Sequence, residues 1–256
     1  LFDMPLAQDP LGLNASQLAT PWVAGIRAVE GGTRKTVHQE QVGWVMNHRI
    51  QGDLSLNTRF YRGDRSNLQY QAGTGAVATD GTWVSLQRQY HGLGANLQGQ
   101  RDGTVPMQWT VGVETDQSGE QRQGGTTRFG QMSGSPNRNE WNQASNQDYF
   151  AQANWFVDER WTLTTGVRSS RVDLRSRDDY LSDGNGSGAV QYRATNPVLG
   201  LTWHVTDQWN VYANQGKGFE TPTLSEAISI SINPKCRNNH NINMVAIYIW
   251  CTNWLK

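Results

Sequence analysis

Cationic and aromatic residues stand in the longest polar stretch of the sequence, residues 118–146. Arg128, Phe129, Arg138 and Trp141 are the candidates there for holding a ligand. A guanidinium pairs with oxyanions through two parallel hydrogen bonds, and an aromatic ring offers a flat face for stacking. These side chains could therefore contact an anionic ligand that carries a ring. The alternative is a solvated loop in which none of them touches a ligand.

Catalytic and metal-binding patterns are missing from the sequence. The five histidines form no close cluster with metal-ligand spacing, and no serine occupies a Gly-x-Ser-x-Gly turn. Cys236 and Cys251 are the only cysteines; they could form a disulfide, although their spacing does not establish that they pair. The sequence predicts no enzyme, no cofactor and no metal site.

The bulk composition excludes some partners and favours strands. The chain has 256 residues, a formal net charge of zero, 27 glycines and 11 tryptophans. No basic face is available for nucleic acid, and no apolar run approaches the length of a membrane-spanning helix. Few segments have a helical period, so we expect many strands joined by Gly, Asn and Asp turns.

Alternation of apolar and polar residues is the main structural signal. In residues 107–115, Met107, Trp109, Val111 and Val113 fall on one face of an extended chain, and the polar residues between them fall on the other. Nine residues is about the length that crosses a bilayer as a tilted strand. The same pattern predicts about eight strands, at 37–50, 53–64, 84–99, 106–117, 147–157, 160–175, 190–204 and 208–218.

The expected connections alternate between short and long. Short links fall near 51–53, 101–105, 158–159 and 206–207, and long polar links fall at 65–83, 118–146 and 176–189. This rhythm is typical of an antiparallel transmembrane β-barrel, with tryptophans gathered beside the short turns as at a membrane interface. These tryptophans are Trp109, Trp155, Trp161, Trp203 and Trp209. A soluble sandwich or lipocalin-like barrel also alternates and is the other interpretation.

The run "YANQGKGFETPTLSE" (212–226) resembles the barrel segment of TonB-dependent outer-membrane receptors. Its matching residues include Gly216, Gly218, Phe219, Glu220, Thr221 and Pro222. Residues 33–50, 149–172 and 196–214 are similar to other strands and hairpins of the family. The resemblance implies a Gram-negative outer-membrane protein that contacts outer-membrane lipid, takes up a ferric siderophore or similar iron complex, and draws energy from the TonB complex.

The chain also departs from the family. Large transporters of this kind have about 22 strands and a plugged lumen. Nothing near the start of this sequence resembles the plug domain or the segment that contacts TonB. We therefore expect an incomplete barrel, a curved open sheet that is not competent for transport alone. The alternatives are a small eight-stranded structural or adhesive barrel, and an outer-membrane hydrolase with an active site on its rim.

Composition divides the chain near Ala227. Only two isoleucines precede that point, whereas the following 29 residues contain six isoleucines and no Gly, Asp or Glu. We expect residues 1–227 to form the partial barrel domain and residues 228–256 to be an atypical tail outside the family sequence. The rival interpretation is a genuine terminal strand, at 244–250, that seals the edge of the sheet.

Overall fold

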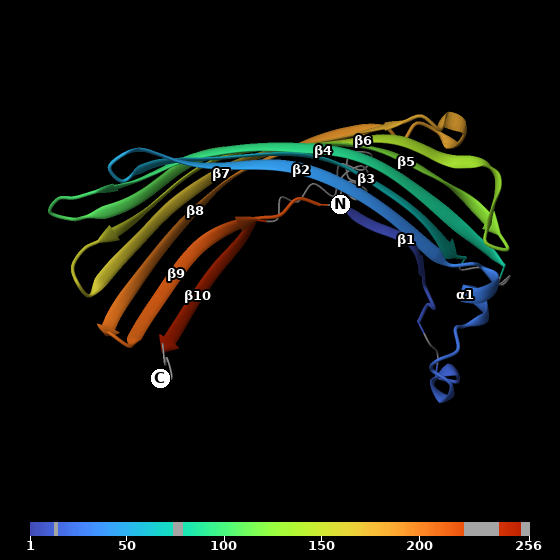
Figure 1. Cartoon of the computed structure of the whole chain (residues 1–256), viewed down its shortest axis with the longest axis horizontal. Coiled ribbons are helices and arrows are strands. Elements are labelled where there is room, and N and C mark those ends of the chain that lie inside the picture. The colour runs from blue at the N-terminus through green and yellow to red at the C-terminus, as the bar shows by residue number, and fades with distance from the viewer. Residues whose placement is uncertain (13–14, 74–78, 223–240, 252–256) are drawn as a thin grey trace.

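The computed structural model of the chain describes residues 1–12, 15–73, 79–222 and 241–251, the last range by its backbone alone. Ten strands form one antiparallel sheet in which every strand pairs with its neighbours in sequence, from β1 to β10. Figure 1 shows this sheet curved into an arch with an open underside. The described strands β1 and β10 are the two ends of the order and do not pair with each other, so the sheet is not a closed cylinder.

The strands are long and their connections mostly short. Two 3₁₀ turns, η1 (Gln17–Ala19) and η2 (Leu181–Asp183), and one helix, α1 (Ile26–Glu30), lie in connections. No helix of the described ranges is long and apolar enough to cross a membrane. The strands are β1 Phe2–Gln8, β2 Arg34–Gln51, β3 Leu54–Ala72, β4 Asp80–Arg101, β5 Met107–Arg128, β6 Gln131–Phe156, β7 Trp161–Asp178, β8 Gly188–Thr206, β9 Trp209–Phe219 and β10 Asn241–Cys251.

The expected strands are confirmed as β2 to β9, and so is the curved, open sheet. The structure adds β1, and it adds β10 in register with β9 from Asn241↔Phe219 to Cys251↔Trp209. From the sequence, a genuine terminal strand at 244–250 was the alternative to an atypical tail outside the family sequence. The packing of its side chains lies outside the described residues, and the domain boundary at Ala227 stays a prediction. The alternative of a small closed eight-stranded barrel is wrong, because the described sheet is wider and open.

The prediction of a long loop at 118–146 is wrong. Strands β5 and β6 continue through this stretch and meet in a tight turn at Phe129-Gly130, whose φ angles are 49° and 66°. Two successive positive φ values are typical of the hairpin turns that match the twist of paired strands. The links at 73–79 and 179–187 are also shorter than expected, because β3, β4, β7 and β8 extend beyond their predicted ends.

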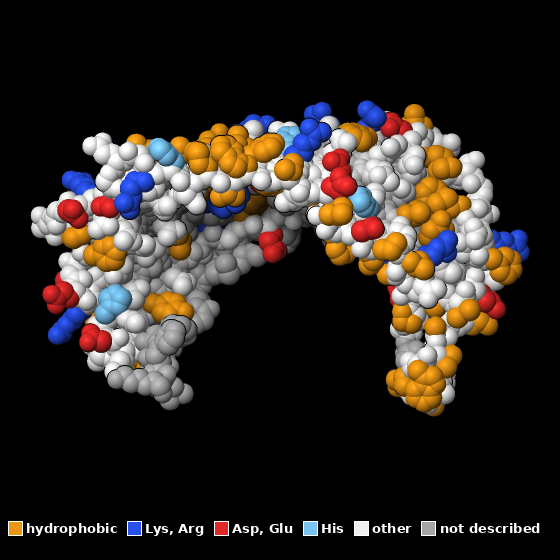
Figure 2. All heavy atoms as spheres, in the orientation of Figure 1, with side chains coloured by type: hydrophobic (Ala, Val, Ile, Leu, Met, Phe, Trp, Pro, Cys, Tyr) orange, Lys and Arg blue, Asp and Glu red, His pale blue; other side chains and the backbone are white. Residues whose placement is uncertain are grey.

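The two faces of the sheet differ in chemistry. The convex face carries a band of exposed apolar side chains, here called the apolar band: Val42, Trp44, Phe60, Leu93, Val111, Val113, Tyr149, Val167, Leu199 and Leu201. Hydrophobic side chains are visible along this side in Figure 2. The same face of a soluble sandwich would be buried against a second layer. A broad exposed band instead suits contact with hydrocarbon, as on the outer surface of a transmembrane barrel.

Local hydrogen bonds form two of the short turns. In the β6–β7 turn, Asp158 Oδ1 accepts hydrogen bonds from the backbone N–H groups of Arg160 (2.7 Å) and Trp161 (2.8 Å). In the β8–β9 turn, Thr206 Oγ1 accepts from the N–H groups two and three residues later, at 3.2 and 3.1 Å. Both turns therefore place a tryptophan at the start of the next strand, which accounts for Trp161 and Trp209 beside these short turns.

Candidate functional site

The concave face is built around two tyrosines, each of which lies across a glycine of the neighbouring strand. In the register of β3 and β4, Tyr61 stands opposite Gly92 and Gly63 stands opposite Tyr90. A Cβ placed on Gly92 would lie 2.5 Å from the Tyr61 ring, and one placed on Gly63 would lie 2.6 Å from the Tyr90 ring. The glycines therefore let both rings lie against the sheet, with centroids 6.2 Å apart.

Polar neighbours hold both tyrosines in place. The Tyr61 hydroxyl donates a hydrogen bond to Asp116 of β5. Gln39 Nε2 donates to the Tyr90 hydroxyl at 2.9 Å, and that hydroxyl donates to Gln41 Oε1 at 2.9 Å. Rings fixed by hydrogen bonds at their outer ends present a preorganised surface, which reduces the entropy lost when a ligand binds.

A hollow of about 410 Å³, here called the concave hollow, opens beside these rings. Two arginines line it, and they stand directly opposite each other in the register: Arg65 of β3 and Arg88 of β4. Arg88 is paired with Glu120, at 2.7 Å between Nη2 and Oε2. Among the described residues, no carboxylate lies within ion-pair distance of Arg65. The hollow thus combines aromatic rings with a guanidinium available to an anion.

A row of ion pairs crosses the same face nearer the short turns. Arg59 Nη2 lies 3.1 Å from Glu114 Oε1, and the Gly94 backbone separates the two in the register. Arg168 Nη2 lies 3.4 Å from Glu114 Oε2 and 2.6 Å from Asp148 Oδ2. Only 2% of the Asp148 side chain is exposed. This row gives the concave face the charged, polar character expected of a barrel lumen.

The four ligand candidates named from the sequence do not come together. Arg128 ends β5 and its guanidinium carbon lies 6.0 Å from the ring centroid of Phe129 in the turn. Arg138 and Trp141 lie in β6, three residues apart, so their side chains leave opposite faces of the sheet. Arg138 pairs with Glu140 at 2.7 Å on the concave side, whereas Trp141 lines a hollow of the convex side. Their ligand role stays a prediction.

The family-motif residues lie at the end of β9 and just after it. Gly216, Gly218 and Phe219 belong to the strand, and Glu220, Thr221 and Pro222 follow it. The Phe219 ring packs at 6.5 Å from that of Tyr192, in a small apolar cluster with Leu174. Through this cluster, the end of β9 packs against side chains of β7 and β8. Cys236 lies outside the described residues, so the pairing of the two cysteines stays untested.

Sequence reasoning missed the residues of the concave hollow, although a signal was present. The tripeptides Tyr61-Arg62-Gly63 and Tyr90-His91-Gly92 repeat one spacing on adjacent strands. Antiparallel pairing of two Tyr-x-Gly segments places each tyrosine opposite the glycine of the other. In the described residues, no group of three or more His, Cys, Asp and Glu side chains could hold a metal ion.

An open antiparallel sheet with an apolar convex face and a charged concave face is a section of a transmembrane β-barrel wall. Comparison with protein families gives the class a name. Residues 7–244 match the family model "TonB dependent receptor-like, beta-barrel", and the chain therefore belongs to the TonB-dependent receptor family. The match extends beyond Ala227 into the segment expected to be an atypical tail.

Solved structures of receptors and transporters share this fold. The unliganded ferric citrate transporter FecA is 16% identical with a TM-score of 0.73, and the match covers 85% of this chain and 32% of that one. The ferric preacinetobactin receptor BauA of Acinetobacter baumannii is 15% identical (TM-score 0.60; 73% and 31% covered). The copper transporter OprC is 15% identical (TM-score 0.58; 76% and 32% covered). The chain spans about a third of the length of these proteins. The family and these relatives are receptors and transporters, not enzymes.

Proposed function

We propose that this chain forms part of the barrel wall of a Gram-negative outer-membrane receptor that takes up a ferric siderophore or a similar iron complex. The apolar band faces lipid, and the concave face lines the passage that the ligand enters. The observation that carries the proposal is the concave hollow, where Tyr61, Tyr90 and Arg65 meet on the polar side of a wall that is apolar on its other side. The ferric ligands named for FecA and BauA support the choice of ligand class.

The charge of the hollow favours an anionic complex. Arg65 and Arg88 add two positive charges to its wall and Asp116 adds one negative charge. Of the two arginines, Arg88 is paired with Glu120, and Arg65 has no carboxylate within ion-pair distance among the described residues. Iron complexes formed by carboxylate or catecholate oxygens commonly carry net negative charge. A guanidinium that pairs with such an oxygen contributes more than a neutral hydrogen bond does. The rings of Tyr61 and Tyr90 would contact the organic part of the ligand.

Calorimetric titration of the detergent-solubilised chain tests this proposal, with ferric citrate, a ferric catecholate and a ferric hydroxamate as probes. We expect at least one anionic complex to bind and Arg65→Gln to weaken it roughly 10- to 150-fold, since a hydrogen bond to a charged group is worth about 1.5–3 kcal/mol. Arg62→Gln is the matched control: it removes the same group from the same strand, three residues away on the convex face. Equal affinities in the two variants, or binding of none of the probes, would refute the proposal.

Transport by this chain alone is a separate matter. In the family, the plug and the contact with the TonB complex couple ligand movement to energy, and no segment of this sequence resembles either one. We propose that the 256 residues bind ligand without transporting it. A strain that lacks its own receptor and produces only these residues should not recover growth on the ferric complex as iron source. Energy-dependent rescue of growth would contradict this.

A further inference from the structure

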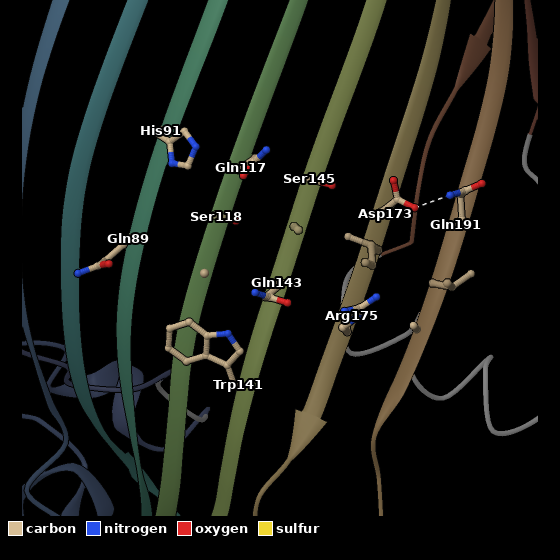
Figure 3. Close-up of a pocket in the computed structure, with 15 residues that line it drawn as sticks. Gln89, His91, Gln117, Ser118, Trp141, Gln143, Ser145, Asp173, Arg175 and Gln191 are labelled. Atoms are coloured by element: carbon tan, nitrogen blue, oxygen red, sulfur yellow. Dashed lines mark hydrogen bonds between the residues drawn. The ribbon is translucent and has the colours of Figure 1, made fainter.

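A second hollow, of about 610 Å³, lies on the convex face and is here called the convex hollow. Its floor includes one complete row of residues paired across β4 to β8: His91, Gln117, Ser145, Asp173 and Gln191. The row shares the face of the apolar band, because His91 is two residues from Leu93 and Gln117 is four residues from Val113. Figure 3 shows the side chains of this hollow spread over the neighbouring strands.

On β4 and β5, the convex hollow begins where the apolar band ends. At about 3.3 Å per residue, its first row lies roughly 7–13 Å along the strands beyond Leu93 and Val113, toward the β5–β6 turn and away from the short turns. If the apolar band meets hydrocarbon, as in the proposed function on which this inference rests, the row lies at the level of the lipid headgroups. A molecule held there would be part of the membrane surface rather than cargo in the lumen.

An indole forms one wall of the hollow. Trp141 of β6 lies beside Gly119 of β5, where an added Cβ would come within 3.1 Å of the indole Cζ2. The glycine therefore leaves the ring against the bare backbone, and Figure 3 shows it reaching across β5 below Gln143. An aromatic face that is both apolar and rigid packs well against the C–H face of a sugar ring.

The polar groups around the indole suit hydroxyls. In the described residues, no hydrogen bond or ion pair engages the side chains of Gln117, Gln143 or Arg175, all of which line the hollow. Asp173 is already satisfied, since Arg171 Nε donates to it at 2.8 Å and Gln191 Nε2 donates to it as well. Free amides can donate and accept at once, which matches the mixed donors and acceptors of a saccharide. A patch for a simple anion would instead gather cations.

We propose that the convex hollow binds the saccharide headgroup of a glycolipid from the surrounding membrane leaflet, with Trp141 stacking on a sugar ring and Gln117, Gln143 and Arg175 hydrogen bonding to its substituents. Continuity with the apolar band selects a membrane glycolipid over a free saccharide, because the acyl chains and the headgroup of one molecule can lie along the same strands. The bound headgroup would fix the wall in its lipid without blocking the passage.

Calorimetry on the full chain in mild detergent tests the inference with two probes: intact lipopolysaccharide in mixed micelles, and the core oligosaccharide released from it by mild acid. We expect the intact glycolipid to bind at least about 10-fold more tightly than the free core oligosaccharide. Trp141→Ala and Gln143→Ala should each weaken binding of the intact glycolipid about 5–10-fold. Trp44→Ala removes an exposed indole from the apolar band, away from the hollow, and should leave this binding nearly unchanged.

Three results would overturn the inference: equal binding by wild type and Gln143→Ala, an equal loss in Trp44→Ala, or a free oligosaccharide that binds as tightly as the glycolipid. If the Trp141→Ala variant fails to fold, the Gln143→Ala variant still tests the inference, because it leaves the indole in place. The ferric-complex titration is run on the same samples. Samples that bind the ferric complex but no glycolipid refute only this inference, and samples that bind glycolipid but no ferric complex refute only the proposed ligand.

Discussion

Replacing Gly92 with alanine tests how the concave face is assembled. The added Cβ would lie 2.5 Å from Asp116 Oδ1 and from two atoms of the Tyr61 ring. Neither neighbour can yield easily, because the ring is rigid and its hydroxyl is bonded to that same carboxylate. We expect the ring to tilt away from the sheet and to lose this hydrogen bond. The substitution should therefore lower the free energy of unfolding and also change the shape of the concave hollow, which Tyr61 lines.

The magnitude follows from three effects. Overpacking costs about 1–3 kcal/mol, and losing the hydrogen bond costs about another 1 kcal/mol at this partly exposed position. Replacing a strand glycine returns about 0.5–1 kcal/mol of backbone entropy. The net loss is about 2 kcal/mol, or roughly 4–8 °C in the midpoint of thermal unfolding for a chain of this size.

Gly200→Ala is the matched control, since Gly200 is also a strand glycine of the concave face. There an added Cβ meets Thr164 Cβ at 3.5 Å, an ordinary contact, so this variant should be as stable as wild type or slightly more stable. Thermal unfolding in detergent, followed by tryptophan fluorescence and circular dichroism, measures both. Combining Gly92→Ala with Tyr61→Ala should remove most of the cost, because the ring is gone. A Gly92→Ala chain as stable as Gly200→Ala would refute the reasoning.

Three further predictions concern other parts of the chain. Asp148→Asn should lower the free energy of unfolding by about 1–3 kcal/mol, measured by thermal unfolding, because the buried carboxylate pairs with an arginine. Asp179→Asn removes a carboxylate from an exposed ion pair and should lower it by less than about 0.5 kcal/mol. Equal losses in the two variants would contradict a stabilising role for the buried ion pair. Trp161→Ala should lower stability by about 1 kcal/mol more than its lost area explains, because its ring stacks on Trp203 at 5.6 Å, and a double-mutant cycle that finds no coupling would contradict this. Sequencing the DNA around the codons for residues 228–256 should reveal receptor-like sequence in another frame, whereas an intact frame shared by full-length relatives would show that the tail is genuine.

The strands within the apolar band were predictable because one face of each had to meet an apolar environment. Residues 107–115 alternate strictly, and the register places Val111 and Val113 opposite apolar residues of both β4 and β6. The strands' extensions beyond the band were not predictable in this way. Residues 118–128 are polar on both faces, so no period distinguishes them from a loop, and backbone pairing with β4 and β6 is what makes them a strand.

The residue types of the proposed site could be named from the sequence, but their positions could not. Arginines and aromatic side chains were expected to supply ligand-binding chemistry, and the proposed site contains both types, yet the residues chosen were those of a supposed loop. In the structure, Arg138 and Trp141 leave opposite faces of β6, and the concave hollow takes its tyrosines and arginines from β3 and β4 instead. Strand register decides which side chains meet, and only the repeated Tyr-x-Gly spacing pointed to it in the sequence.

Spin-label accessibility along β5 tests the central claim, that one face of this sheet meets lipid and the other lines a polar passage. Single cysteines are placed in turn at residues 109–116 in a chain whose two native cysteines are replaced by serine, and the labelled chains are reconstituted in bicelles. The account predicts a period of two: high collision rates with oxygen at 109, 111 and 113, and high rates with a water-soluble nickel chelate at 110, 112, 114 and 116. Uniform exposure to the nickel chelate, or a lipid-facing signal at the even positions, would contradict it.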